Sequence, residues 1–314
     1  ANKAKKKQKK VELKEIKLRP VTEIHDYSFK IKNAQFNSPI IAASGTFGYG
    51  NEIDGVIDYS KIGCIITKSI TLEERKGNLN PRIIEAENGM LNAIGLANVG
   101  VEKFCQNKMS ILNDLPTNYM ISVAGSKKND YLKVIDYLEN NDGNHIGYEI
   151  NVSCPNVKKG GIEFGVNKEI LIELTSNLRA MTQKLLFIKL SPNVTSIEEL
   201  AQVVENAGAD GISAVNTFLG MAIDYKTGQF SLSNIYGGLS GPAIKPLALA
   251  KIHKIYNSVN IPIFGMGGIS SYKDIIEFMR VGSSMVQVGT LNYRDPFIIC
   301  KFYDDLMKFS KDNG

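Results

Sequence analysis

The chain contains short runs of apolar and β-branched residues that alternate with longer amphipathic segments. Eight such runs end in a small, polar or charged residue, and each is followed by a segment long enough for a helix. A strand and a helix repeated eight times predict an α/β protein with a closed parallel (β/α)8 barrel of the TIM type. The predicted strands are residues 40–43, 64–67, 120–123, 148–151, 187–190, 211–215, 263–265 and 285–288.

Two of the intervening segments carry clear helix signals. Ser196 precedes two glutamates and an apolar face that includes Val203 and Val204, and residues 271–279 repeat this pattern. Before the first barrel strand, residues 11–36 alternate in places, and we expect them to form a hairpin that closes the floor of the barrel. The two longest intervals between strands predict inserted loops at the C-terminal rim.

A doubly wound open sheet is the competing fold. Its dinucleotide fingerprint is incomplete here, because the stretch from Gly265 to Ser270 lacks the third glycine and lies near the C-terminus. We therefore favour the barrel. We expect it to form a single domain over residues 21–314, after a basic and flexible tail over residues 1–20.

The composition is typical of a globular protein. Of the 314 residues, 43% are hydrophobic and 22% are charged, which excludes collagen-like, low-complexity and disordered chains. No stretch is apolar enough to span a membrane, and the start of the chain lacks the apolar core of a secretory signal. We therefore expect a cytoplasmic protein that does not associate with a membrane.

The net charge of +5 comes from the first 20 residues, and the rest of the chain is slightly acidic. The lysine run over residues 5–10 is compatible with a nucleic-acid tether, a lipid tether, a localisation signal or a solvated tail, of which we favour the tail. We expect no nucleic-acid partner.

The cysteines and histidines predict no metal site. None of the four cysteines and three histidines shows the spacing of a zinc or iron–sulfur site. Cys64, Cys105 and Cys300 are interpreted as packing residues. Cys154 differs, because asparagines flank it on the loop after the fourth strand and two glycines follow at 160–161.

Polar residues and glycines gather at the predicted C-terminal ends of the strands, where the active sites of such barrels lie. Glycine pairs after the seventh and eighth strands, 267–268 and 289 with Thr290, favour a phosphate site built from backbone amides, although tight turns need the same glycines. Lys68 and Lys189 at the mouth require an anion, which a flavin mononucleotide (FMN) supplies. A Schiff-base lysine of an aldolase is the alternative.

Three segments together resemble the class 1 dihydroorotate dehydrogenases, the flavin enzymes of pyrimidine biosynthesis. Residues 151–156 (NVSCPN) are similar to the family signature around the catalytic base, which is cysteine in class 1 and serine in the membrane-associated class 2. Residues 78–96, with GMLNAIGL at 89–96, and residues 238–246 (GLSGPAIKP) are similar to the class 1B catalytic subunit. The resemblance extends from about residue 39 to residue 290.

The resemblance implies a role for each matching residue. Cys154 would be the catalytic base. Implied substrate contacts come from Lys68, Asn92, Ala93, Ile94, Gly95, Leu96, Asn151, Asn156, Asn216 and Thr217. Implied FMN contacts come from Ser44, Gly45, Lys68, Ser69, Ser122, Asn151, Lys189, Val215, Gly241, Gly267, Gly268, Gly289 and Thr290. The family commonly has an asparagine where this chain has Ser122, and a hydroxyl there reaches the flavin edge directly or through a water.

The implied reaction is the oxidation of dihydroorotate to orotate. Cys154 takes the proton from C5, and hydride passes from C6 to flavin N5. In class 1B, electrons continue to a partner subunit that carries FAD and a 2Fe–2S cluster and reduces NAD, whereas class 1A enzymes use fumarate. The resemblance favours a homodimer, within a heterotetramer if the iron–sulfur flavoprotein is present.

Three other functions remain open from the residues alone. A related FMN barrel would act on another dihydropyrimidine. A colourless lyase would use Lys189 as a nucleophile, and a phosphate-ligand binding protein would show no turnover at all.

Overall fold

The eight predicted apolar runs form the strands of one closed parallel barrel. The computed structural model describes residue 18 and residues 27–53, 55–153 and 167–313. In spatial order around the barrel, the strands are β10 (Gly211–Ala214), β13 (Ile263–Met266), β14 (Met285–Val288), β3 (Ile40–Ala42), β4 (Cys64–Ile66), β7 (Tyr119–Ala124), β8 (Gly147–Asn151) and β9 (Leu185–Lys189). The predicted (β/α)8 barrel is therefore confirmed.

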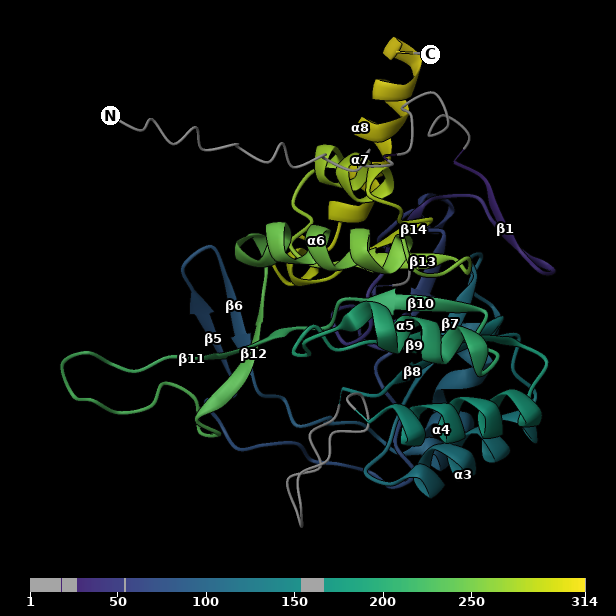
Figure 1. Cartoon of the computed structure of the whole chain (residues 1–314), viewed down its shortest axis with the longest axis horizontal. Helices are drawn as coiled ribbons and strands as arrows, with labels where there is room; N and C mark the ends of the chain where they lie inside the picture. Colours follow the sequence, from purple (N-terminus) through teal and green to yellow (C-terminus); the bar gives the residue numbers. More distant parts are fainter. Residues whose placement is uncertain (1–17, 19–26, 54, 154–166, 314) are drawn as a thin grey trace, which may run out of the picture.

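Helices cover the outside of the barrel, and consecutive helices from α3 to α8 pack against one another (Figure 1). Both predicted helix starts are confirmed, since Ser196 and Ser271 are the N-cap residues of α5 and α7. The helical elements are η2 (Tyr59–Lys61), α1 (Val101–Phe104), η3 (Cys105–Met109), α2 (Ser110–Asn113), α3 (Lys128–Glu139), α4 (Lys168–Met181), α5 (Ile197–Asn206), η4 (Pro242–Ile244), α6 (Lys245–Tyr256), α7 (Tyr272–Arg280), η5 (Thr290–Tyr293) and α8 (Ile298–Asn313).

The segment between β3 and β4 departs from the predicted strand–helix repeat. Its described residues hold only the short helix η2, because Gly45, Gly48 and Gly50 have positive φ angles of 80°, 57° and 117°, which a right-handed helix does not allow. Helix α8 packs against β3 and η2 in its place, and Lys61 pairs with Asp304 at 2.8 Å.

A short hairpin closes the N-terminal end of the barrel, as the sequence predicts. It consists of β1 (Phe29–Ile31) and β2 (Ala34–Phe36). The Phe36 side chain is fully buried, with its ring edge toward Phe264 at a centroid distance of 6.0 Å. Phe264 in turn stacks on Phe187 at 4.1 Å, so aromatic side chains pack against one another at the floor of the barrel.

The two longest insertions form a sheet, where the sequence predicted loops. Strands β5 (Ile83–Ala86), β6 (Gly89–Asn92), β11 (Phe218–Met221) and β12 (Tyr236–Ser240) pair in the antiparallel order β11–β12–β6–β5. This sheet extends from one side of the barrel (Figure 1). Its pairing joins segments far apart in the sequence, such as Gly238 with Asn92, and local periodicity carries no signal for such pairing.

Candidate active site

The C-terminal ends of the parallel strands place two asparagines side by side. Asn151 ends β8, and Asn216 follows β10. Asn216 Nδ2 donates to Asn151 Oδ1 at 3.3 Å, and the same oxygen accepts the Ser153 N–H at 3.2 Å. Asn216 Oδ1 accepts the Thr217 N–H at 2.9 Å. These bonds hold both amides in fixed orientations, so the remaining donors and acceptors can read a polar ring.

Lys68 follows β4 at the same end of the barrel. Its backbone N–H donates to the Gly48 carbonyl at 2.9 Å, and its side chain is half-buried. Burial, together with the positive charge of Arg82, lowers the pKa of Lys68, while Glu52 opposes that change. An anionic ligand beside Lys68 would offset the cost of its desolvation.

A layer of polar side chains crosses the barrel interior below the mouth. Glu149 on β8 is completely buried, and its Oε1 lies 3.2 Å from Lys189 Nζ on β9. Gln287 on β14 donates from Nε2 to Glu149 Oε2 at 2.8 Å and to Ser213 Oγ on β10 at 3.0 Å. Because β8 and β14 lie on opposite walls of the barrel, these bonds cross its axis. The layer holds the Lys189 ammonium in one place.

The sequence interpretation gave no role to Glu149, Gln287 or Ser213. The available signal was their position: each is a polar residue inside an apolar run, and Glu149 is two residues before Asn151 on the same strand face. Two other predicted residues, Ser69 and Ser122, bond to each other, and Ser122 lies opposite Glu149 in the register of β7 and β8. Ser122 is fully buried, and its hydroxyl lies 2.8 Å from that of Ser69.

Three glycine segments converge beside β13 and β14. A Cβ placed on Gly268 would lie 2.8 Å from both the Gly241 carbonyl oxygen and the Lys245 nitrogen, so these backbones are in close contact. Gly267 and Gly268 have positive φ angles of 127° and 80°. Thr290 Oγ1 donates to Ser240 Oγ at 2.8 Å and connects the third segment. A Cβ on Gly289 would be in ordinary van der Waals contact with Ala43, at 3.6 Å, so this third segment is less tightly packed than Gly268.

The remaining predicted residues also lie around this rim. The predicted FMN contact Ser44 donates from Oγ to the Thr67 carbonyl at 2.8 Å, and Gly45, with φ of 80°, borders open space. Val215 is buried after β10. Asn92 ends β6 and donates to the Gly238 carbonyl at 3.3 Å. Ala93, Ile94, Gly95 and Leu96 follow it and are held by Asn78, whose side chain donates to the Ala93 carbonyl at 2.8 Å.

Two predicted site residues, Cys154 and Asn156, lie outside the described residues. The three described cysteines match their interpretation as packing residues only in part: Cys64 is fully buried in β4, whereas Cys105 and Cys300 are half-buried in helical segments. Burial raises the pKa of the Cys105 thiol to about 11, which makes it a poor base or nucleophile near neutral pH.

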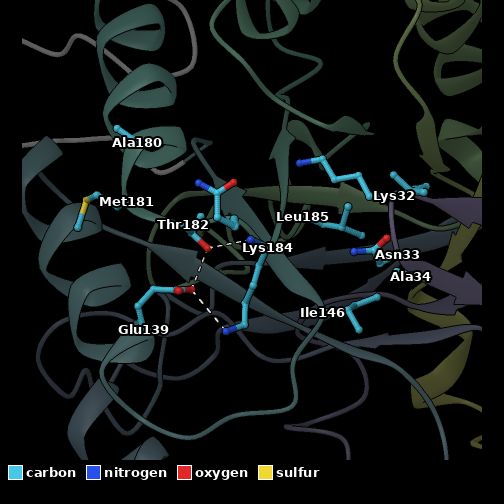
Figure 2. Close-up of a pocket in the computed structure, with 12 residues that line it drawn as sticks. Lys32, Asn33, Ala34, Glu139, Ile146, Ala180, Met181, Thr182, Lys184 and Leu185 are labelled. Atoms are coloured by element: carbon cyan, nitrogen blue, oxygen red, sulfur yellow. Dashed lines mark hydrogen bonds and ion pairs between the residues drawn. The ribbon is translucent and has the colours of Figure 1, made fainter.

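A separate cavity of about 530 Å³ lies at the opposite end of the barrel, between the β1–β2 turn and the end of α4 (Figure 2). Glu139 and Thr182 line it and are joined by a hydrogen bond of 2.9 Å. No predicted site residue lines this cavity. Among the described residues, no His, Cys, Asp and Glu side chains form a group of three that could hold a metal ion, and no helix is suited to crossing a membrane.

Comparisons with known proteins agree on one family. A family model described as dihydroorotate dehydrogenase matches residues 27–309. The catalytic subunit of dihydroorotate dehydrogenase B (NAD(+)) from Bacteroides thetaiotaomicron is 44% identical over 289 residues, which cover 92% of this chain and 95% of that protein. The protein of the same name from Bacillus mycoides is 45% identical over 277 residues, covering 88% of this chain and 89% of that protein.

Proposed function

Since the chain belongs to the dihydroorotate dehydrogenase family, we propose that it oxidises dihydroorotate to orotate in pyrimidine biosynthesis, with FMN as hydride acceptor. Enzymes of this family are flavin-dependent oxidoreductases. The observation that carries the proposal is the convergence, at one rim, of paired asparagines, a lysine held by a buried glutamate, and three glycine segments. Together these groups suit a planar polar substrate and a phosphorylated ring.

The substrate role falls to Asn151, Asn216 and Lys68. Orotate and dihydroorotate present imide N–H and C=O groups, which asparagine amides can pair with, and a carboxylate that an ammonium group attracts. The proposed substrate contacts also include Asn92, residues 93–96 and Thr217. Because the amides of Asn151 and Asn216 are already bonded to each other, little rotamer freedom is lost when the substrate binds.

The cofactor role falls to Lys189 and the glycine segments. The amides of Gly267, Gly268, Gly289 and Thr290, close to Gly241, would receive the phosphate, since backbone N–H groups near helix starts bind anions well. Lys189 would face the flavin ring, and Ser44, Gly45, Ser69 and Val215 would border it. Bound flavin supplies a two-electron acceptor that no side chain provides. Ser122 supports this site through its bond with Ser69.

Lys189 is better suited to electrostatic stabilisation than to Schiff-base chemistry. Its Nζ lies 3.2 Å from Glu149 Oε1, and an ammonium held by a carboxylate is a poor nucleophile. In its proposed role it stabilises the negative charge that accumulates on a reduced flavin ring. This observation favours the redox function over the lyase.

Cys154 is the proposed base that removes the C5 proton of dihydroorotate, on the side opposite to hydride departure from C6. An unperturbed thiol has a pKa of about 8.5, so turnover should rise as pH increases toward that value. We expect Cys154→Ser to keep FMN and orotate binding and to lose most turnover near pH 7, because a serine hydroxyl is a far weaker base there. Turnover close to that of the wild type would exclude Cys154 from this role.

The direct test of the proposed function is spectroscopic. We expect the purified protein to be yellow or to become so when FMN is added, and dihydroorotate to bleach the flavin absorption without oxygen. Dihydrouracil, offered in a parallel sample, should leave the absorption unchanged. Bleaching by dihydrouracil alone would assign the enzyme to another dihydropyrimidine, and protein that cannot bind FMN would refute the redox proposal.

The similar catalytic subunits carry NAD(+) in their names, and we propose that this chain also passes its electrons to a partner subunit. That subunit would be an iron–sulfur flavoprotein with FAD and a 2Fe–2S cluster. The fumarate-linked alternative makes a different prediction: reduced enzyme alone would be reoxidised by fumarate. Stopped-flow reoxidation with fumarate, and with NAD in the presence and absence of the co-expressed partner, distinguishes the two acceptors.

We also propose that two copies of the chain associate through the inserted sheet. Met221 pairs with Tyr236 across β11 and β12, and Leu219 lies on the same face of β11. Their exposed fractions are 49%, 55% and 68% respectively. An exposed apolar face of this kind on a sheet is typical of an interface between subunits.

A further inference from the structure

Asp274 is a buried carboxylate that connects two segments of the proposed phosphate site. It lies in the first turn of α7 and is only 4% exposed. Its Oδ2 accepts the Ser270 N–H at 2.8 Å, the Ser270 hydroxyl at 2.8 Å and the Ser271 hydroxyl at 3.2 Å. Its Oδ1 accepts Lys245 Nζ at 2.6 Å. One carboxylate therefore binds a loop through one oxygen and a helix start through the other.

The two segments that Asp274 connects both belong to the proposed phosphate site. Ser270 lies two residues after Gly268, with Ile269 between them, whereas Lys245 is the first residue of α6. The Gly268 backbone already lies against the Lys245 nitrogen, as the short Cβ distance shows. Asp274 bonds to both segments at this contact, to Ser270 on one and to Lys245 on the other.

The loop needs such a connection because its glycines have wide conformational freedom. Gly267 and Gly268 both have positive φ angles, and glycine gives up more backbone entropy than other residues when it is ordered. A charge-assisted bond from Asp274 to Ser270, two residues after Gly268, restricts the loop before a ligand binds, and this lowers the entropic cost of binding. Burial raises the pKa of Asp274, but its bonds with Lys245 and Ser270 outweigh burial and hold the pKa below its usual value.

We propose that Asp274 is a positioning residue for the cofactor phosphate: it fixes the Gly267–Gly268 loop against the start of α6 so that their amides point at one anion. The inference rests on the proposed FMN-binding function. It makes a specific claim, because the contribution of Asp274 should appear in the affinity for the phosphate and be missing from the affinity for the flavin ring.

Glu277 offers a matched control. It also bonds Lys245 Nζ, at 2.9 Å, but it is exposed and no contact links it to Ser270. Glu277→Gln therefore removes a carboxylate from the same lysine and leaves the loop connection intact. Asp274→Asn is a milder companion to Asp274→Ala, because the amide oxygen can still accept one bond while the ion pair with Lys245 is lost.

The experiment compares FMN with riboflavin, which lacks the phosphate. Apoprotein of the full chain is titrated with each ligand, and quenching of flavin fluorescence gives both dissociation constants. We expect Asp274→Ala to weaken FMN binding by about tenfold or more while riboflavin binding stays within about twofold of wild type. Asp274→Asn should show a smaller loss of the same kind, and Glu277→Gln should bind both ligands as the wild type does.

The other outcomes overturn the inference in distinguishable ways. An unchanged ratio of FMN to riboflavin affinity in both Asp274 variants would refute the positioning role while leaving FMN binding intact. Equal weakening for both ligands would show that Asp274 only supports the fold. If Asp274→Ala does not fold, the ratio in Asp274→Asn decides. Wild-type protein that binds neither ligand would refute the proposed function together with this inference.

Discussion

At the scale of single residues, the polar layer inside the barrel sets the character of the candidate site. A buried glutamate and a nearly buried lysine are costly to desolvate, and this cost is met only when each charge has a partner and further hydrogen bonds. Glu149 meets both conditions, since Lys189 and Gln287 each contact one of its oxygens. In this layer the Lys189 ammonium lies at the base of the barrel mouth, with the Glu149 carboxylate as its partner.

Removing one charge of this pair should destabilise the fold. We expect Glu149→Ala to lower the free energy of unfolding by about 3–5 kcal/mol, because Lys189 is then buried without a counter-charge. Urea unfolding followed by circular dichroism measures the difference. The control is Glu199→Ala, which breaks the exposed pair of Glu199 with Lys168 and should leave the free energy of unfolding close to that of the wild type. Equal losses in the free energy of unfolding for the two variants would show that the buried pair stabilises the fold no more than the exposed pair does.

Lys68 predicts how substrate affinity depends on pH. Burial lowers its pKa, so its ammonium group loses the proton at a lower pH than a free lysine does. The proposed attraction for the orotate carboxylate should therefore weaken as pH rises through the alkaline range. Titration of orotate into oxidised holoenzyme at several pH values measures this effect. In Lys68→Arg the charge persists, and the alkaline loss should disappear; a loss identical to wild type would point to another group.

At the scale of secondary structure elements, the barrel was predictable and the inserted sheet was not. Most residues of the barrel strands are buried on both faces, so each strand appears in the sequence as a largely apolar run. Strand β12 contains two glycines and β11 is partly exposed, so neither has a periodic apolar pattern. The sequence pattern did not predict the polar layer either, because Glu149 and Gln287 become hydrogen-bond partners only when the barrel closes.

The candidate site was predicted more by resemblance than by pattern. Glycines and lysines at the ends of the strands predicted a site at the C-terminal rim, and the closed parallel barrel places these strand ends on one side. The pattern could not show that Asp274 bonds Lys245 and Ser270, since this requires knowing that α6 and α7 are neighbours. Cys154 was identified from its motif and stays a prediction.

A chain of hydrogen bonds between β8 and α3 predicts acid sensitivity. His145 Nε2 lies 2.7 Å from Tyr148 Oη, and Tyr148 donates to Glu139 Oε1 at 2.5 Å. Burial, with a contribution from Lys184, lowers the pKa of His145 to about 3. The unfolded chain binds a proton at His145 below about pH 6.5 and the folded protein does not, so stability falls with decreasing pH.

The expected slope is about 1.4 kcal/mol per pH unit between pH 6.5 and the pH near 3 where folded His145 also becomes charged. Urea unfolding between pH 6.5 and pH 5 measures it, because most carboxylates remain ionised there. His145→Gln should flatten this part of the profile. The same slope in the variant would show that another group is responsible.

At the scale of the whole molecule, the two ends of the barrel differ. The hairpin β1–β2 closes the N-terminal end with aromatic packing, whereas the C-terminal end carries the inserted sheet and the polar rim. Aromatic side chains close the floor, and the proposed chemistry and subunit contact belong to the rim.

The proposed contact between two copies makes a prediction about assembly. Leu219→Glu combined with Tyr236→Lys places charges on the exposed face of β11 and β12, and we expect the double variant to sediment as a monomer. Ile172→Glu serves as the control, because Ile172 is 46% exposed on α4, away from this sheet. Sedimentation velocity at several concentrations checks the result. An unchanged dimer in the double variant would place the interface elsewhere.

The closure of the barrel has a consequence for biosynthesis. Its first and last strands, β3 and β14, are neighbours, with Ile41 opposite Gln287, so the ring cannot be completed until β14 has left the ribosome. The rim segments that would receive the flavin extend from Ser44 to Thr290 and share this constraint. Under the proposed function, FMN would therefore be loaded only after β14 has emerged, and a nascent chain stalled before that strand would remain empty.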